Sequence, residues 1–283
     1  MSSPIDTNQP DHIVDTHEMV TDTNQVSEVL QGDCLELMKD IPDGSVDMIL
    51  ADLPYGTTAC KWDTIIPFEP LWEQYKRIIK PNGAIVLTAQ EPFATHLRMS
   101  SFDMYRYDWY WKKSKPGAYQ HAKNKPMTAI ENVCVFSPSK IGHRSLMGGK
   151  RMEYNPQGVK ESGVKVVNRN YNSSKTRGER PNQLGRKYMS YTGFPSDLLE
   201  FGSVVGNAAQ HPTQKPVALF EYLIKTYTNE GDLVLDNVAG SGTTGVACQN
   251  TNRNFILMEQ EPEYVEIIKK RLELNKKQLE AEL

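Results

Sequence analysis

Long apolar stretches, paired cysteines and an export signal are all missing from this sequence of 283 residues. No apolar run approaches the roughly 20 residues that a membrane-spanning helix needs, so no membrane span is expected. The first residues lack a basic segment followed by an apolar one, which argues against export. The four cysteines are scattered without a C-x-x-C pair, which argues against a disulfide framework and a zinc knuckle. We therefore expect a cytoplasmic protein.

Two further absences argue against two classes of ligand, metal ions and nucleoside triphosphates. His121, His143 and His211 have no ligand-like spacing, so no metal site is expected. A glycine-rich segment at residues 240–245 is not followed by the lysine of a P-loop, so a nucleoside triphosphate is not the expected ligand.

Charge is divided unevenly along the chain. The formal net charge is −3, but residues 106–190 hold 18 Lys and Arg against 5 Asp and Glu, and the remainder holds 14 against 30. The basic segment also contains Trp109, Trp111 and several tyrosines. Basic side chains neutralise phosphates and aromatic rings stack on bases. This combination favours nucleic acid as the partner over the alternative of a solvated basic face.

Apolar periodicity predicts alternating strands and helices over most of the chain. Residues 1–27 are polar and acidic, and we expect them to form a disordered tail. Strands are expected at residues 29–30, 46–51, 84–88, 105–111, 130–136, 233–235 and 255–258. Helices are expected at residues 34–39, 68–80, 91–99, 216–227, 243–250 and from 261 onward. This alternation predicts an α/β fold with a mostly parallel sheet covered on both faces.

A break in this alternation divides the domain. Residues 139–195 are rich in Gly, Pro, Asn and Ser and show no sustained helical period, which predicts a loop-rich insertion. We expect residues 28–138 and residues 196–283 to be two halves of one domain on either side of this insertion.

The segment LVLDNVAGSGTTGVA, residues 233–247, predicts a cofactor site. A buried strand ends at Asp236, a glycine turn follows at residues 240–242, and a helix then begins. Glycines at such a turn allow a ligand to approach the backbone, and the helix N-terminus offers free N–H groups. The next strand ends at Glu259, where a carboxylate can accept hydrogen bonds from ribose hydroxyls.

Asp236 favours one nucleoside-containing cofactor. Residues 240–245 match the dinucleotide fingerprint G-x-G-x-x-G formally. A carboxylate ahead of the glycines would repel a pyrophosphate but would attract the ammonium group of an amino acid. S-adenosylmethionine has an ammonium group and a ribose and carries no phosphate, so we expect this cofactor.

The segment Asp52-Leu53-Pro54-Tyr55 suits methyl transfer to an amino group on a base. Such a nitrogen is a poor nucleophile because its lone pair is delocalised into the ring. Asp52 can accept one N–H, and the carbonyl of Leu53 or Pro54 can accept the other, with proline fixing the backbone. Tyr55 offers a flat face for stacking. The base must leave the duplex first, at a cost of a few kcal/mol. The alternative is an ordinary turn after a strand.

These motifs resemble those of the DNA amino-methyltransferases. D-L-P-Y at 52–55 is similar to the motif [DNS]-P-P-[YF], and D-N-V-A-G-S-G-T-T at 236–244 resembles D-P-F-x-G-S-G-T-T. H-P-T-Q-K-P at 211–216 resembles a segment that accompanies the second motif. The catalytic motif comes first, the variable basic segment second and the cofactor motif last. This permuted order is typical of the β group, which includes many adenine-N6 enzymes of bacteria and their phages.

The resemblance, which covers about residues 28–275, implies a Rossmann-like, circularly permuted methyltransferase sheet. It implies that residues 139–195 are the target-recognition region. The catalytic residues that it implies are Asp52, Pro54 and Tyr55. It implies a cofactor site of Asp33, Cys34, Lys215, Asp236, Ala239, Gly240, Ser241, Gly242, Thr243, Thr244 and Glu259. Two departures are Leu53 in place of the first proline and Asn237-Val238 in place of Pro-Phe.

The expected macromolecular substrate is double-stranded DNA. The substrate-binding candidates are Leu53, Gly56, Trp62, Lys112 and Lys113. A core position is an equal alternative for Trp62. A position at a solvated strand end is a nearly equal alternative for Lys112 and Lys113. Many members of the resembled group pair up, so a homodimer is possible, but the sequence leaves the oligomeric state open.

Three other functions stay as alternatives. The aspartate at position 52 favours adenine-N6 over cytosine-N4 methylation, for which serine is more usual. Methylation of a protein glutamine usually goes with N-P-P-Y after the cofactor motif, the reverse of the order here. A non-catalytic DNA-binding module would not need Asp52, Tyr55 and the glycine turn together. The recognition sequence, a partner nuclease and the role of the tail cannot be read from the sequence.

Overall fold

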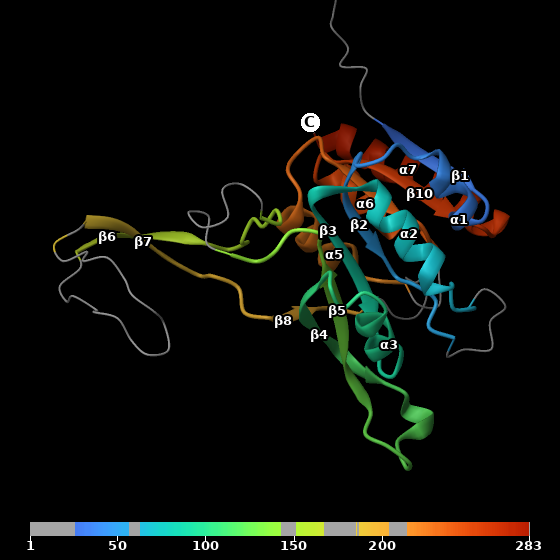
Figure 1. Ribbon diagram of the computed structural model, residues 1–283, viewed down its shortest axis with the longest axis horizontal. Helices are drawn as coiled ribbons and strands as arrows, with labels where there is room; N and C mark the ends of the chain where they lie inside the picture. The colour runs from blue at the N-terminus through green and yellow to red at the C-terminus, as the bar shows by residue number, and fades with distance from the viewer. Residues whose placement is uncertain are drawn as a thin grey trace, which may run out of the picture.

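The computed structural model describes residues 26–56, 63–142, 151–166, 185, 187–203 and 214–282. An eight-stranded sheet runs through its centre (Figure 1). In spatial order its strands are β1 (Ser27–Gln31), β10 (Asn254–Glu259), β9 (Leu233–Asp236), β2 (Val46–Ala51), β3 (Ile79–Ala89), β5 (Thr128–Phe136), β4 (Tyr105–Gly117) and β8 (Leu198–Phe201).

The expected mostly parallel sheet is confirmed. Strands β1, β10, β9, β2 and β3 are parallel, β5 is antiparallel to both β3 and β4, and β8 is parallel to β4. Because the carboxyl ends of parallel strands meet at one edge, the segments after β2, β9 and β10 come together although β2 is far from the others in the chain.

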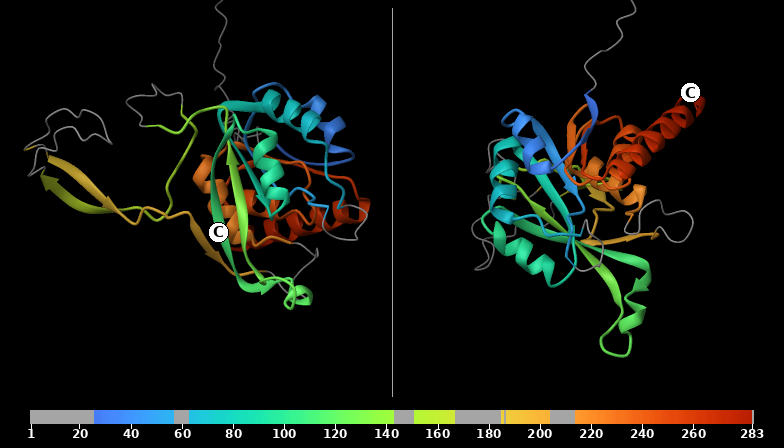
Figure 2. Two further views of the ribbon diagram at one scale, coloured as in Figure 1. Left: turned by 60° about the horizontal axis from the view of Figure 1, so that its bottom comes forward. Right: turned by 90° about the vertical axis from the view of Figure 1, so that its right-hand side faces the viewer.

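Helices cover both faces of this sheet (Figure 2). On one face lie α1 (Cys34–Leu37), a 3₁₀ turn at Met38–Asp40, α2 (Phe68–Ile78) and α3 (Phe93–Ser100). On the other lie α5 (Val217–Tyr227), α6 (Thr243–Asn250) and α7 (Pro262–Glu282). Strand β2 is apolar on both sides: Ile49 packs in the first layer, whereas Met48 and Leu50 pack in the second. This explains the apolar run from Met48 to Ala51.

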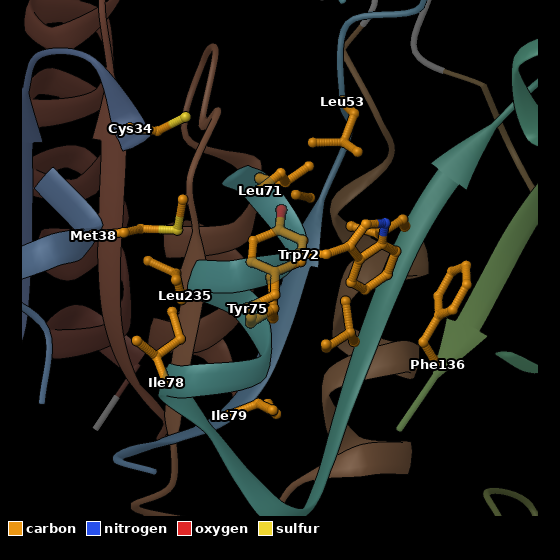
Figure 3. Packing of buried hydrophobic residues seen from close by; sticks show 14 of the residues in the cluster. Cys34, Met38, Leu53, Leu71, Trp72, Tyr75, Ile78, Ile79, Phe136 and Leu235 are labelled. Carbon is orange, nitrogen blue, oxygen red and sulfur yellow. The ribbon is translucent and has the colours of Figure 1, made fainter. Parts of the chain in front are cut away.

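The core beneath the first layer is built around α2 (Figure 3). Tyr75 is fully buried, and its hydroxyl donates to Oδ1 of Asn237 over 2.6 Å. Nδ2 of Asn237 in turn faces Sγ of Cys34 at 3.4 Å. Asn237, one of the two departures from the resembled motif, is thus a satisfied buried group that ties α2 to the turn after β9.

Two segments differ from the expected pattern around Pro81. Helix α2 ends at Ile78 instead of residue 80, and β3 already begins at Ile79. Ile79 pairs with Val46 and is buried, and the register then shifts before the regular pairing begins at Ala84. The burial of Ile79 and its pairing with Val46 therefore start the strand before Pro81.

The insertion contains an unexpected two-stranded sheet. Strands β6 (Lys160–Val166) and β7 (Lys187–Thr192) pair antiparallel and project away from the main sheet (Figure 1). Strand β8 was not expected either, and β4 extends six residues beyond the expected end at residue 111. No helix within the described part of the chain has the length and apolar character for crossing a membrane.

Candidate active site

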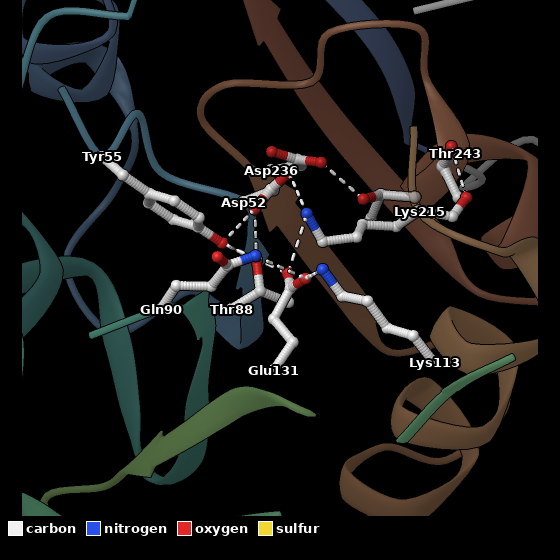
Figure 4. A network of polar contacts seen from close by, with 10 residues as sticks. Asp52, Tyr55, Thr88, Gln90, Lys113, Glu131, Lys215, Asp236 and Thr243 are labelled. Atoms are coloured by element: carbon white, nitrogen blue, oxygen red, sulfur yellow. Dashed lines mark hydrogen bonds and ion pairs between the residues drawn. The ribbon is translucent and has the colours of Figure 1, made fainter. Parts of the chain in front are cut away.

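Asp52 directly follows β2 at the carboxyl edge of the sheet (Figure 4). Its Oδ1 accepts a hydrogen bond from the hydroxyl of Tyr55 over 2.7 Å and another from the hydroxyl of Thr88 on β3. The side chain remains 22% exposed. Asp52 is therefore held by hydroxyl donors on one oxygen while the carboxylate still reaches solvent.

Asp52 is one of four charged side chains that alternate in sign, and we call these four the charge row: Lys113, Glu131, Lys215 and Asp52. Nζ of Lys215 lies 2.5 Å from Oδ2 of Asp52 and 3.0 Å from Oε1 of Glu131. Nζ of Lys113 lies 2.6 Å from Oε2 of Glu131. The row is neutral as a whole, and Figure 4 shows its side chains converging from different elements.

The charges of the row stabilise one another. Burial by itself would lower the pKa of Lys215, but the carboxylates of Asp52 and Glu131 outweigh it and raise that pKa. Burial would likewise raise the pKa of Glu131, but the ammonium groups of Lys215 and Lys113 lower it to about 2. Both groups are therefore ionised at neutral pH.

Tyr55 and Leu53 are less exposed to solvent than expected for residues of a turn. The Tyr55 ring packs against Phe93 at 5.1 Å between centroids, and burial raises the pKa of its hydroxyl. Leu53 is only 3% exposed and its side chain belongs to the core, so any substrate contact there falls to its carbonyl. Pro54 is half-buried. The N–H of Gly56 donates to Oδ1 of Asp63 over 2.9 Å, while Trp62 lies outside the described residues.

The glycine turn after β9 is fixed by two carboxylates. Asp236 accepts the Val238 N–H over 3.1 Å and the Thr244 hydroxyl over 2.5 Å. Glu259, at the end of β10, accepts the Gly240 N–H over 2.8 Å. Gly242 is the N-cap residue of α6 and has a φ of +78°, and an added Cβ would meet Ile268 at 3.0 Å. Only glycine fits this position without strain.

The electrostatics at the turn suit a cation. Burial raises the pKa of Asp236 to about 7, and the negative charges of Asp52 and Glu259 add to the shift. The buried carboxylate of Asp236, with the charges of Asp52 and Glu259 near it, favours a positive group placed beside it. The ammonium group of S-adenosylmethionine meets that requirement, so the donor and acceptor set fits this cofactor.

The other residues of the implied cofactor site surround this turn. The Gly32 N–H donates to the carbonyl of Glu259, which brings the segment of Asp33 and Cys34 beside the end of β10. Asp33 caps α1, and Cys34 is buried, which raises the pKa of its thiol. The hydroxyl of Thr243 lies 3.5 Å from the carbonyl of Lys215.

Ala239 and Ser241 complete the turn. Ala239 is buried, and its N–H donates to the carbonyl of Met258 over 2.8 Å. Nη1 of Arg271 donates to the carbonyl of Ser241 over 2.5 Å. The residues of motif 236–244 and Glu259 are thus assembled at one edge of the sheet, while residues 211–213 of the accompanying segment lie outside the described ranges.

The two lysines named as substrate-binding candidates lie in different surroundings. Lys112 is exposed but pairs with Glu200 at 2.7 Å. Lys113 has only 17% of its side chain exposed and pairs with Glu131, because alternate residues of β4 face opposite sides. Lys113 therefore belongs to the charge row and is not a free surface contact.

Sequence reasoning missed Thr88 and Glu131. Glu131 is 2% exposed and shares its face of β5 with Val133 and Val135. An acidic residue in the inward register of an otherwise apolar strand was the available signal, because a buried charge requires a partner. Thr88 lies near the end of β3, an apolar strand that pairs with β2. A polar residue at that position was the available signal for Thr88.

Comparisons with known proteins show the family to which the chain belongs. Residues 46–270 match the family model described as DNA methylase. The Type II methyltransferase M.HpaI of Haemophilus parainfluenzae is 27% identical over 254 residues, covering 84% of this chain and 72% of the relative. The DNA adenine methyltransferase YhdJ of Escherichia coli (strain K12) is 27% identical over 280 residues, covering 89% of this chain and 84% of the relative.

A solved structure has the same fold. The structure of an M1.HpyAVI–SAM complex superposes with a TM-score of 0.54 at 25% identity, and covers 87% of this chain and 100% of that chain. Both the catalytic turn after β2 and the glycine turn after β9 fall inside the stretch matched by the family model. The chain belongs to the DNA methylase family.

Proposed function

We propose that this protein transfers a methyl group from S-adenosylmethionine to the N6 amino group of adenine in double-stranded DNA, by direct in-line transfer after the base has been flipped out. The observation that best supports this proposal is the position of Asp52. Asp52 directly follows the central strand β2, and its carboxylate is partly open to solvent and lies beside the buried carboxylate of Asp236 at the glycine turn (Figure 4).

Asp52 supplies the acceptor that the reaction needs. It accepts one N–H of the target amino group, and the carbonyl of Leu53 or Pro54 accepts the other, which returns electron density to the nitrogen. Thr88 and Tyr55 hold the carboxylate in place through Oδ1. Orientation and preorganised electrostatics then provide the acceleration, with no covalent enzyme intermediate.

The residues around the glycine turn hold the cofactor, which supplies the methyl group from its sulfonium when bound. Glu259 would accept hydrogen bonds from the ribose hydroxyls, Asp33 would bind near the adenine, and Asp236 would pair with the ammonium group. The M1.HpyAVI complex is a relative of the same fold that carries S-adenosylmethionine, which supports this assignment.

The projecting hairpin β6–β7 supports contact with duplex DNA. Every residue of β6 is exposed, and Lys165 lies directly opposite Tyr188 across the hairpin. A two-stranded ribbon fits the major groove, where base edges are accessible. A hairpin of two strands is at best marginally stable alone, so a surface that it binds would also stabilise it. We assign target recognition to residues 139–195 on this basis.

The remaining features of the proposal follow the resembled group. Residues 28–138 act as the catalytic half and residues 196–283 as the cofactor half, in the permuted order. The protein acts in the bacterial cytoplasm and can pair into a homodimer. Adenine is favoured over cytosine because position 52 is aspartate and because a relative, YhdJ, is named a DNA adenine methyltransferase.

Methyl transfer tests the proposal. The protein is incubated with S-adenosylmethionine labelled in its methyl group and with unmethylated duplex DNA of varied sequence. Incorporation of label into DNA by the unsubstituted protein, and its loss in D52A, is expected. A protein that binds the cofactor but transfers no label to any duplex would overturn the proposal.

A further inference from the structure

We propose that Glu131 is a positioning residue that keeps Asp52 available to the target amino group by holding part of the Lys215 ammonium charge. This inference rests on the proposed methyl transfer at Asp52. It concerns a residue on β5, the reversed strand of the described sheet, which none of the sequence motifs includes.

The hydrogen-bond capacity of Asp52 is nearly used up. A carboxylate offers about four lone-pair positions. Tyr55 and Thr88 donate to Oδ1, and Lys215 donates to Oδ2. About one position is left for an N–H of the target base, and it lies on the oxygen that already contacts Lys215.

Glu131 divides the Lys215 ammonium between two carboxylates. Nζ of Lys215 is 2.5 Å from Asp52 and 3.0 Å from Glu131. With Glu131 neutral, Asp52 would be the remaining carboxylate of the charge row, and it alone would compensate the ammonium of Lys215. A carboxylate that compensates a full cation alone has less negative charge to offer to a weak donor such as an amino group.

Stability does not by itself explain why a charge occupies this position. Buried ion pairs pay a large desolvation cost, and apolar replacements are often neutral or stabilising. Glu131 is nevertheless satisfied on both oxygens: Lys113 and Gln90 contact Oε2, and Lys215 contacts Oε1. Its two neighbours on the same face of β5, Val133 and Val135, are apolar core residues.

The first test compares two isosteric substitutions. In E131Q, the single-turnover rate of methyl transfer is expected to fall by about ten- to a hundredfold, and the Kd for S-adenosylmethionine should stay within about twofold. E200Q is the matched control, because Glu200 also pairs with a lysine of β4 but is exposed. Its rate and Kd should equal those of the unsubstituted protein.

The second test separates positioning from charge balance. E131Q leaves the ammonium of Lys113 without its carboxylate, which would destabilise the fold. The double variant K113M/E131Q restores neutrality, so its Tm should recover. Its rate should stay low, because Lys215 still has no second carboxylate. Recovery of the rate together with the Tm would show that Glu131 only balances Lys113 and would overturn the inference.

The two proposals fail in different ways. If the unsubstituted protein transfers no methyl group to DNA, both the proposed function and the role of Glu131 are overturned. If it does transfer methyl and E131Q is as fast as E200Q, only the role of Glu131 is overturned.

Discussion

The ammonium nitrogen of Lys215 lies 2.5 Å from Oδ2 of Asp52, although 163 positions separate the two residues in the chain. Lys215 lies two residues before the start of α5, and its carbonyl lies 3.5 Å from the hydroxyl of Thr243, the residue that follows the glycine turn. The contact therefore joins the catalytic turn to the cofactor turn. The behaviour of Asp52 should depend on groups from both halves of the sheet.

Replacing Asp52 should separate catalysis from cofactor binding. D52A removes the acceptor for the target amino group, so the rate of methyl transfer should fall by at least about a hundredfold. The Kd for S-adenosylmethionine, measured by calorimetry, should change only a few-fold, because the glycine turn is held by Asp236 and Glu259. An equal loss of cofactor affinity and rate would contradict a catalytic role for Asp52.

Replacing Glu259 should have the opposite effect. E259Q removes the charge from the proposed hydrogen bonds to the ribose. Such bonds are worth about 1.5–3 kcal/mol when one partner is ionised, so the Kd should rise about ten- to a hundredfold. E266Q is the matched control, because Glu266 pairs with Lys269 on the exposed side of α7. Unchanged affinity in E259Q would place the ribose elsewhere.

The stability of the cofactor-free protein should depend on pH through Asp236. Its pKa is raised by burial from 3.8 to about 7, so between these values the folded protein holds a proton that the unfolded chain has lost. This contribution is complete below the unfolded pKa and disappears as the pH rises through 7. Relative to D236N, the unsubstituted protein should become less stable across that range.

Thermal unfolding measures this difference. The Tm of D236N minus that of the unsubstituted protein should be larger at pH 8 than at pH 5, without cofactor. Saturating S-adenosylmethionine should reduce the gap at pH 8, because an ammonium group stabilises the ionised carboxylate. A gap that does not vary with pH would mean that Asp236 is ionised throughout this range.

The hairpin should contribute a phosphate contact. K165A is expected to weaken duplex DNA binding and to reduce the slope of log affinity against log salt by about 1. K277A is the control, since Lys277 is exposed on α7 and pairs with Glu273. Identical salt slopes for K165A and K277A would place the DNA away from β6–β7.

The sequence alone was sufficient to predict those parts of the fold and of the site that depend on local residue patterns. Residues 46–51 and 243–250 were predicted as a strand and a helix with the bounds that the structure has. Both turns could be identified because strand ends, glycines and carboxylates follow one another along the chain. Their meeting at one edge follows from the parallel sheet.

What the sequence could not give depends on pairing between distant segments. Lys113 was expected at the surface, but its register on β4 directs it to Glu131. Ile79 was assigned to a helix, but pairing with Val46 makes it the start of a strand. The strand β8 is short and half exposed, so its pairing with β4 left no apolar period to detect.

The most direct test of the central claim is the identity of the methylated nucleoside. Duplex DNA treated with the protein and labelled S-adenosylmethionine is digested to nucleosides and resolved by mass, with D52A as the control. The account predicts label in N6-methyladenine with the unsubstituted protein and none with D52A. Label in N4-methylcytosine, or equal label with D52A, would contradict it.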